Sequence, residues 1–582
     1  MKITTPKNLI QKLQSIRITK KQFPIILAVF VIGISLIGYA KAVLNTPSGL
    51  STTSSTVNVS EYANLTNAVS SIGGNRVDLL IDNTTILTAD TTIPTNINLL
   101  VSAKGTINQG TYTLTINGNF SAPNQQVFLG TGSVIGLREA YPQWWGTDAG
   151  AINSAINTVT ENGTKIGTVT IKGTYLVTSP IILSGHINLR IDGELKANTG
   201  FTGNAVIQGR LEETAGYYTE YFTITGDGVV NANNIAAEGV SIHQGRFGKI
   251  TPRVWGATQY GIHLGHADAL ASSYEINVDS NQVWRGDYAN SANSIGIYHE
   301  KCSDSYVTNV VVQGYRTGVR ANMGNIFYTN THVWNRPSTN GPLQYAFYIA
   351  GNMAQLLNCY ADTPSNIGTN GLPDGSITEA YGFYFDAYNV QATNLNLFMN
   401  TSLTPNAAVD NFVTGIRINK TGGLYGQISG FHSSTTSSYK LKKTISVASA
   451  INANIHGITD DGNTYGSDVY DNTYPAVDMK EVRISNDAGV QSALSLLSGG
   501  SDRWIIRKTS DAESGGDTGS NFEVVSRTDS GAYKSTPFSI DRSTGYIKLG
   551  SVPSYANNAA AISGGLEAGE IYLNGDVLQM VH

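Results

Sequence analysis

The stretch GVRANMGNIFYTNTHVW, residues 318–334, contains one full copy of a pattern that recurs through the middle of the chain. It begins with a glycine and an apolar residue, Gly318-Val319, and reaches Asn330 twelve residues later. Further starts of this kind are Gly239-Val240, Gly261-Ile262, Gly296-Ile297, Ala346-Phe347 (with Ala in place of Gly), Gly382-Phe383 and Gly415-Ile416. Further asparagines of the second register are Asn309, Asn358 and Asn394.

The two registers lengthen together along the chain. The glycine starts are 22, 35, 22, 28, 36 and 33 residues apart, and the asparagines 21, 28 and 36. Each asparagine follows its start by 12 or 13 residues, so the insertions lie outside that section. A period of about 22 residues with strands and no helix predicts one turn of a parallel β-helix, with turns about 4.8 Å apart. An asparagine at a recurring corner tolerates a left-handed bend and can bond to the next asparagine in the stack.

Alternation within each turn predicts which side chains face outward. Residues one and three places after each start, such as Val319 and Ala321, should face the interior, although His299 departs from this apolar column. Two places after the starts, the outward side chains include Tyr298, Arg320, Tyr348 and Tyr384, and four places after them Glu300 and Asp386. A second outer face, counted from the asparagines, carries His332, Trp334, Tyr360 and Asp362.

The composition agrees with strands and turns. Only 14% of the 582 residues are charged, while Gly numbers 62 and Tyr 30. The hydrophobic content of 41% argues against a disordered chain. A net charge of -5 provides no basic field for nucleic acid, and two cysteines, Cys302 and Cys359, make no disulfide framework.

The N-terminus has the order of segments found in export signals. Residues 1–22 carry six Lys or Arg and no acid, residues 23–40 are uncharged and apolar, and Ala40-Lys41-Ala42 follows. This predicts either a signal peptide cleaved after Ala42 or a retained membrane anchor through residues 23–40. Both fates place the protein outside the cytoplasm, secreted or at the cell surface.

The rest of the chain divides by its local pattern. We expect a Ser/Thr-rich linker at 43–76, an N-terminal β region at 77–140, the parallel β-helix at 141–475, a small β module at 476–550 and a C-terminal tail segment at 551–582. One helix is expected inside the body, because apolar residues recur at helical spacing through Ala151, Ile152, Ala155, Ile156 and Val159.

Several motifs resemble those of a known superfamily. The stretch Tyr141–Val159, then Gly173-Thr174-Tyr175-Leu176 and the Gly226-Asp227-Gly228 turn, is similar to pectate-lyase-superfamily β-helices, which include bacterial polysaccharidases and phage tailspikes. The segment before the helix is shorter here, Thr147-Asp148-Ala149-Gly150. Residues 503–509, with Ser539-Ile540-Asp541-Arg542, resemble small β modules of phage tail-fibre proteins. The pectate-lyase-superfamily resemblance spans roughly residues 78–470 and implies a right-handed parallel β-helix and a polysaccharide partner. The tail-fibre-like modules imply, by analogy, a homotrimer.

The outward residues supply a hypothetical site. Aromatic rings and planar polar groups are the usual sugar contacts, so we assign substrate binding to His332, Trp334, Tyr360, Tyr298, Arg320, Tyr348 and Tyr384. Asp362, Asp386 and Glu300 are the candidate catalytic acids. Glu300 and Asp386 lie three turns apart, about 14 Å, and cannot form a direct pair. The polygalacturonase-like motif set is not intact: Gly265-His266-Ala267 and Arg417-Ile418-Asn419 match it only in part.

Three functions therefore stay open. The protein is an exported polysaccharide-degrading lyase or glycosidase, a non-catalytic carbohydrate-binding adhesin or tailspike-like receptor-binding protein, or a structural envelope spacer. No metal ligand set and no cofactor are assigned, with calcium considered for a lyase.

Overall fold

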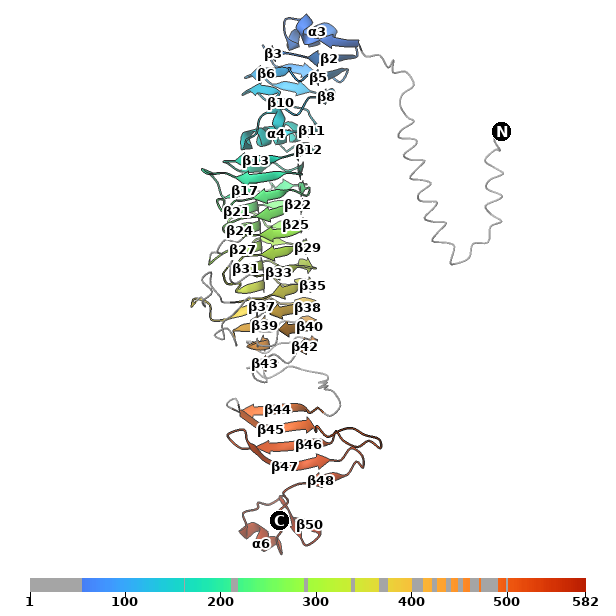
Figure 1. The fold of residues 1–582 in the computed structure, drawn as a ribbon, viewed down its shortest axis with the longest axis vertical. Coiled ribbons are helices and arrows are strands. Elements are labelled where there is room, and N and C mark those ends of the chain that lie inside the picture. Colours follow the sequence, from blue (N-terminus) through green and yellow to red (C-terminus); the bar gives the residue numbers. More distant parts are fainter. Residues whose placement is uncertain are drawn as a thin grey trace, which may run out of the picture. The chain divides into compact units, whose positions relative to one another are not determined.

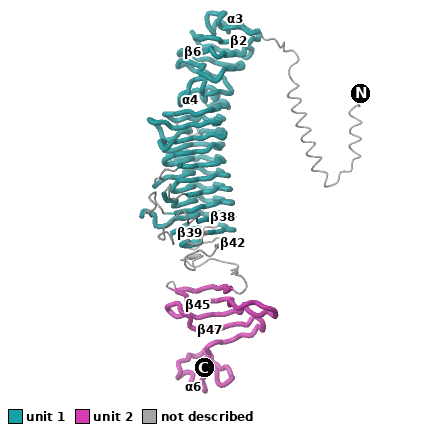
Figure 2. Tube along the Cα trace, viewed as in Figure 1, with its two compact units in different colours: residues 1–477 teal, residues 478–582 magenta. Residues whose placement is uncertain are grey.

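The computed structural model describes residues 55–161, 163–210, 218–286, 292–335, 341–365, 375–399, 412–420, 426–435, 441–447, 454–460, 470–472, 490–498 and 501–582. They belong to two compact units, residues 1–477 and 478–582 (Figure 2). The predicted export segment lies outside the described residues. No helix in the described part of the chain is both long and apolar enough to cross a membrane.

Two long sheets with parallel pairing build most of the first unit (Figure 1), which confirms the right-handed parallel β-helix. The 11-stranded sheet contains β14 (Ile181–Leu183), β17 (Ala205–Gly209), β21 (Glu238–Ile242), β24 (Tyr260–Leu264), β27 (Ile295–His299), β31 (Thr317–Ala321), β34 (Tyr345–Ile349), β37 (Ala380–Phe385), β39 (Val413–Ile418), β41 (Lys443–Val447) and β43 (Tyr470–Asn472). The 22-stranded sheet contains β11 (Glu139–Ala140), β12 (Gly167–Ile171), β13 (Thr174–Val177), β15 (Ile187–Ile191), β16 (Glu194–Ala197), β18 (Thr219–Glu220), β19 (Thr223–Thr225), β20 (Val229–Asn231), β22 (Gly245–Ile250), β23 (Arg253–Trp255), β25 (Ser273–Val278), β26 (Gln282–Trp284), β28 (Cys302–Ser303), β29 (Ser305–Thr308), β30 (Val311–Gln313), β32 (Ile326–Thr329), β33 (His332–Trp334), β35 (Gln355–Leu357), β36 (Tyr360–Asp362), β38 (Gln391–Met399), β40 (Gln427–Thr435) and β42 (Asn454–Asp460).

The asparagine register forms a corner of the 22-stranded sheet. Asn309, Asn330, Asn358 and Asn394 have φ of 56°, 50°, 53° and 52°, the left-handed region that asparagine tolerates better than most residues. The side-chain amides of Asn330, Asn358 and Asn394 each donate to the side-chain Oδ1 of the preceding asparagine, at 3.1, 3.2 and 3.2 Å. The predicted ladder of stacked asparagines is therefore confirmed.

The interior of the stack is apolar and continuous. Val319, Phe347 and Phe383 occupy equivalent places in successive turns, and the two phenylalanine rings stack with centroids 5.0 Å apart. Burying each such side chain contributes roughly 1.5–3 kcal/mol. His299 also faces the interior, where it is fully buried and its Nδ1 lies 3.3 Å from the Tyr328 hydroxyl. The alternation of inward and outward side chains therefore holds at His299, although a histidine replaces the apolar residue expected there.

The N-terminal region consists of three small parallel sheets. These are β1 (Ser55–Asn58), β2 (Val77–Ile81), β5 (Ile97–Val101) and β8 (Phe120–Ser121); β3 (Thr84–Ile86), β6 (Thr106–Gly110) and β9 (Phe128–Gly130); and β4 (Thr91–Ile93), β7 (Leu114–Ile116) and β10 (Val134–Ile135).

Part of the segment expected to be a linker is folded, so that boundary needs correction. Residues 55–76 contain β1, the 3-10 turn η1 (Val59–Glu61) and helix α3 (Leu65–Ile72). The Asn64 side chain caps α3, and Leu65, Ala68 and Ile72 join the hydrophobic core. The polar composition concealed an amphipathic helix of only eight residues.

The helix predicted inside the body is present as α4 (Ala149–Thr160), which follows the 3-10 turn η2 (Pro142–Trp144). The Asp148 carboxylate accepts a hydrogen bond from the Ala151 amide at 2.8 Å and so caps the helix. Its apolar stripe, including Ile152 and Ile156, is buried in the core.

The second unit is antiparallel. A five-stranded sheet contains β44 (Ser492–Ser498), β45 (Ser501–Lys508), β46 (Phe522–Arg527), β47 (Tyr533–Ile540) and β48 (Ile547–Leu549). After it come α6 (Asn558–Ser563) and a hairpin of β49 (Ile571–Asn574) and β50 (Val577–Met580).

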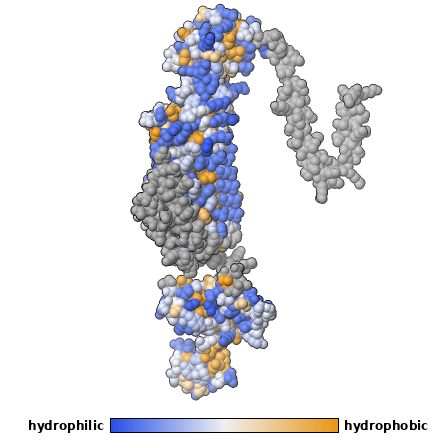
Figure 3. Space-filling view, viewed as in Figure 1, coloured by the Kyte–Doolittle hydropathy of each residue, from blue (hydrophilic) through white to orange (hydrophobic). Residues whose placement is uncertain are grey.

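In Figure 3 the coloured surface over the β-helix of the first unit is mainly hydrophilic.

Candidate functional site

Four of the predicted sugar-contacting residues lie in one column on the outer face of the 11-stranded sheet. Tyr298, Arg320, Tyr348 and Tyr384 pair in register on β27, β31, β34 and β37. The Arg320 guanidinium lies 5.5 Å from the Tyr298 ring centroid and 4.9 Å from that of Tyr348. The Tyr348 and Tyr384 rings stack with centroids 4.9 Å apart. The alternation thus predicted this column correctly, although Tyr298 is only 5% exposed, and the role of the column in binding stays a hypothesis.

A second aromatic column, which sequence reasoning missed, runs beside the first. Tyr345 and Tyr381 are paired on β34 and β37, and their rings stack at 5.3 Å. Each meets the first column edge-on, Tyr345 with Tyr348 and Tyr381 with Tyr384, both at 5.0 Å. These tyrosines stand directly before the Gly or Ala starts in the printed sequence, so the same register could have found them.

Stacking changes how these rings can meet a ligand. Because the ring faces pack on one another from turn to turn, edges and hydroxyl groups are the parts left for contacts outside the stack. No described residue hydrogen-bonds to the hydroxyl of Tyr348 or Tyr384, and both side chains are half-buried. Burial raises the pKa of both phenols, so they stay protonated hydrogen-bond donors at neutral pH.

The other predicted sugar contacts lie on a different sheet. His332 and Trp334 on β33 pair with Tyr360 and Asp362 on β36, within the 22-stranded sheet. The His332 and Tyr360 rings stack at 4.4 Å, and His332 Nε2 lies 3.6 Å from an Asp362 oxygen. The structure therefore divides the predicted residues into two separate surfaces.

The three predicted catalytic acids are not brought together as a pair. Asp362 accepts a hydrogen bond from the Thr363 hydroxyl at 2.7 Å, on the 22-stranded sheet. Asp386 follows β37, and its negative charge adds to burial in raising the pKa of Tyr348 and Tyr384. Glu300 follows β27, three strands earlier in the same sheet. The arrangement of two facing carboxylates that glycoside hydrolysis needs is absent from these three residues.

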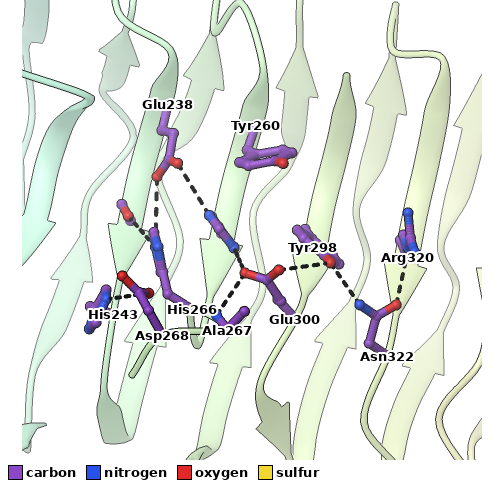
Figure 4. Close-up of polar contacts among 12 residues, drawn as sticks. Glu238, His243, Tyr260, His266, Ala267, Asp268, Tyr298, Glu300, Arg320 and Asn322 are labelled. Carbon is purple, nitrogen blue, oxygen red and sulfur yellow. Dashed lines mark hydrogen bonds and ion pairs between the residues drawn. The ribbon is translucent and has the colours of Figure 1, made fainter. Parts of the chain in front are cut away.

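Glu300 instead belongs to a buried polar cluster with two histidines (Figure 4). One of its carboxylate oxygens lies 3.0 Å from His263 Nε2 and accepts a hydrogen bond from the Ala267 amide at 3.0 Å. The other accepts a hydrogen bond from the Tyr298 hydroxyl at 3.2 Å. Tyr298 in turn accepts one from Asn322 at 2.7 Å, which links the cluster to the Arg320 column.

His263 lies between two carboxylates from neighbouring turns. Its Nδ1 is 3.2 Å from Glu238 Oε1 on β21, while its Nε2 faces Glu300. Burial raises the pKa of the Glu238 carboxyl, but the hydrogen bond and charge of His263 outweigh burial and leave that pKa below its ordinary value. Glu238 is therefore ionised although it is almost fully buried.

His266 completes the cluster after a sharp turn. Gly265 has a φ of 69°, and a Cβ there would come within 2.2 Å of the Lys301 carbonyl oxygen. This turn stacks the His266 ring on that of His263 at 3.8 Å, with His266 Nε2 2.8 Å from the Ser241 hydroxyl. Burial and the charge of His263 lower the pKa of His266 to about 4, so its ring is neutral at pH 7.

Two overlapping sets of side chains in this cluster could hold a metal ion. They are Glu238, His263 and His266, and His243, His266 and Asp268, each with its ligand atoms within 4.8 Å of one another. In the second set the hydrogen bond from His243 at 3.0 Å lowers the pKa of Asp268. Sequence reasoning assigned no metal ligands and treated His266 only as part of an incomplete motif. The available signal was four histidines within residues 243–299 out of nine in the chain.

Comparisons with known proteins identify no family. No protein-family model and no curated protein sequence matches the chain. Among solved structures, ORF18 of Geobacillus virus E2 is similar at 15% identity and a TM-score of 0.43, over 76% of this chain and 86% of that one. The receptor-binding protein of bacteriophage Det7, a podoviral tailspike in a myovirus, is similar at 12% identity and a TM-score of 0.33, over 90% and 95%. The A-module of the Azotobacter vinelandii mannuronan C-5 epimerase AlgE6 has 10% identity and a TM-score of 0.24, over 69% and 98%.

Proposed function

We propose that this protein binds polysaccharide along the outer face of the 11-stranded sheet. The observation that carries the proposal is the column of Arg320, Tyr348 and Tyr384, which follows the buried Tyr298 and lies beside the parallel pair of Tyr345 and Tyr381. The hydroxyl groups of Tyr348 and Tyr384 have no hydrogen-bond partner among the described residues, and Arg320 adds a planar cation between rings. A glycan presents hydroxyl oxygens that both kinds of donor can bind.

A linear polymer suits this surface because the donors repeat in one direction. Equivalent residues in successive turns are separated by about 4.8 Å, so contacts with a polymer accumulate along the stack. Each contact is weak by itself, and several acting together give useful affinity. The proposal includes export, which is supported by the basic, apolar and small-residue order of residues 1–42.

Cleavage of the bound glycan is a second candidate function. The observation in its favour is His263, held between Glu238 and Glu300 and next to Tyr298 at the end of the same surface. A histidine between carboxylates can transfer protons, as either elimination or hydrolysis requires. The predicted acids Asp362 and Asp386 lack such an arrangement, so Glu300 is the acid that we retain for this role.

A polysaccharide screen tests both candidates. The purified full chain is incubated with panels of bacterial capsule and plant polysaccharides, and retention is measured by affinity electrophoresis. New reducing ends indicate hydrolysis, ultraviolet-absorbing unsaturated ends indicate elimination, and retention without either indicates an adhesin. If no polysaccharide on broad panels retards the chain, the proposal is wrong and a structural spacer becomes the better reading.

A further inference from the structure

We propose that Glu238, His263 and His266 form a binding site for a divalent transition-metal ion, with zinc the preferred ion. The three side chains come from β21, from β24 and from the turn that follows β24, so adjacent turns of the β-helix build the site together. The site does not depend on the proposed glycan binding, because all three ligands belong to this chain and their ligand atoms lie within 4.8 Å of one another without a sugar.

The donor set matches the chemistry of zinc. Two imidazole nitrogens and one carboxylate oxygen are a common set of protein ligands for zinc, whereas calcium requires six to eight oxygens. Zinc binds such ligands at about 2.1 Å, so ligand atoms around a tetrahedral ion are about 3.4 Å apart. Here Glu238 Oε1 is 3.2 Å from His263 Nδ1, and Glu238 Oε2 is 4.0 Å from His266 Nε2. All three ligand atoms lie within 4.8 Å of one another, so small side-chain shifts are enough to reach an ion.

The buried Glu238 carboxylate has an unmet need for a partner. Its side chain is 7% exposed, and Oε2 makes no hydrogen bond, its ion-pair contact with His266 Nε2 being long at 4.0 Å. A buried charged oxygen without a partner costs free energy, usually more than a neutral one. This oxygen is the one on the side of His266, where the ion would lie, so metal binding would give it a close partner.

Glu300 has the geometry of a supporting residue for this site. If His263 binds the ion through Nδ1, its Nε2–H donates to Glu300 at 3.0 Å. A carboxylate behind a metal-binding histidine fixes the ring and its tautomer. Glu300 is itself held by the Ala267 amide and the Tyr298 hydroxyl, so the orientation of His263 is set by three separate contacts.

Binding requires one local adjustment. The His263 and His266 rings are stacked with 26° between their planes, and stacked rings do not point their nitrogens at one atom. His266 is the more exposed of the two, at 21% against 4%, so it is the ring that turns and gives up its contact with Ser241. Three protein ligands leave a fourth position for water, as in catalytic rather than structural zinc sites.

The neighbouring set of His243, His266 and Asp268 is the weaker of the two. It shares His266, and its Asp268 side chain is 82% exposed and therefore well solvated without a metal. Only the Glu238 set contains two almost fully buried ligands together with the oxygen that makes no hydrogen bond. We therefore place the ion between Glu238 and the two stacked histidines.

Direct metal titration tests the site. The full chain, without a polyhistidine tag and freed of metal by a chelator, is titrated with Zn²⁺ by calorimetry and with Co²⁺ by visible absorption, in the absence of polysaccharide. We expect one ion per chain, displacement of Co²⁺ by Zn²⁺, and no competition from Ca²⁺. Absence of Zn²⁺ binding, or equal competition by Ca²⁺, would overturn the assignment whatever the result of the polysaccharide screen.

Variants locate the bound ion. His266→Ala should weaken Zn²⁺ binding at least tenfold, and its partial exposure favours retention of the fold, which circular dichroism checks. Glu300→Gln, behind the ligand, should weaken it about 10- to 100-fold. His186→Asn is the matched control, because His186 lies outside the cluster and asparagine tolerates its φ of 52°. If the control loses as much affinity as His266→Ala, or neither His266→Ala nor Glu300→Gln loses any, the ion is elsewhere and the proposal is wrong.

Discussion

Gly318 lies so close to Val333 that a Cβ on residue 318 would come within 2.2 Å of Val333 Cγ1. The same relationship recurs at Gly239 with Val254 and at Gly261 with Val283, at 2.2 and 2.3 Å. At these positions the glycine register exists because a valine of the 22-stranded sheet packs against the backbone of the 11-stranded sheet, and at Gly382 and Gly415 the side chains of Leu397 and Phe431 take that place. Val333 follows Gly318 by 15 residues, and where the chain has Ala346 in place of glycine, the residue 15 places later is Ala361 rather than valine.

Gly318→Ala should therefore destabilise the β-helix by about 1–3 kcal/mol through overpacking. Val333→Ala in the same chain should recover part of this loss, because it recreates the pair found at Ala346 and Ala361. Urea unfolding followed by circular dichroism measures both effects. Gly74→Ala serves as the control, since nothing lies within 4 Å of a Cβ at that position. Strict additivity of the two substitutions in a double-mutant cycle would show that the contact does not govern the register.

The asparagine ladder leads to a second prediction. Asn330 combines a φ of 50° with side-chain hydrogen bonds to Asn309 and from Asn358. Asn330→Ala loses both and keeps the Cβ that disfavours left-handed backbone, so a loss of about 2–3 kcal/mol is expected. Asn330→Gly loses the hydrogen bonds alone and should be milder, as Gly430 and Gly457 occupy positive φ in later turns. Unfolding midpoints in urea decide the order, and a glycine variant less stable than the alanine variant would contradict this account.

These two columns explain why the fold could be predicted from the sequence and much of the site could not. Backbone conformation and packing favour glycine at the position of Gly318 and asparagine at that of Asn330 in successive turns, so these residue types repeat in the sequence. The cluster of Glu238, His263 and His266 occurs once, and its members are 25 and 3 residues apart along the chain. It therefore leaves no repeating pattern in the sequence. His266 reaches His263 only because Gly265 bends the chain, a three-dimensional effect that alternation does not contain.

The predicted aromatic residues show a related limit. Alternation correctly placed Tyr348 and Tyr384 outward, but it could not show that their rings stack face to face. It also placed Asp362 and Asp386 on different outer faces, and the structure has them in and directly after strands of different sheets. The register of the repeats gives the order of residues within one face. The relative positions of residues on different faces depend on insertions of unequal length.

The buried His299 predicts how stability depends on pH. Burial lowers the pKa of His299 to about 3 from the ordinary 6.5, with a smaller contribution from His263, and the group in contact with its ring is Tyr328. His299 is therefore protonated near pH 6.5 in the unfolded chain, but only near pH 3 in the folded protein. Stability is fully present above pH 6.5 and falls as the pH decreases through that window, by up to about 1.4 kcal/mol per pH unit for one proton.

His299→Gln removes the titrating imidazole. The free energy of unfolding of this variant should therefore depend less steeply on pH below pH 6.5, while the curves of variant and wild type stay parallel above pH 7. The free energy of unfolding, measured in urea from pH 4 to 8, gives the two slopes. The level of the variant's curve is not the criterion, because the substitution also alters packing. Equal slopes for variant and wild type would show that His299 does not titrate as its burial implies.

The proposed glycan surface gives the last prediction, which concerns the part of each tyrosine that meets the sugar. The ring faces of Tyr348 and Tyr384 are occupied by each other, so their hydroxyls should make the contacts. Tyr348→Phe and Tyr384→Phe should then each weaken binding of a retained polysaccharide about three- to tenfold, the value of one hydrogen bond, although the stack survives. Tyr306→Phe is the matched control, because Tyr306 is exposed and stacks on Phe327 in the 22-stranded sheet. If the phenylalanine variants bind as well as the wild type while Tyr360→Phe on the other face does not, the glycan lies along β33 and β36, and the surface assigned to the 11-stranded sheet is the wrong one.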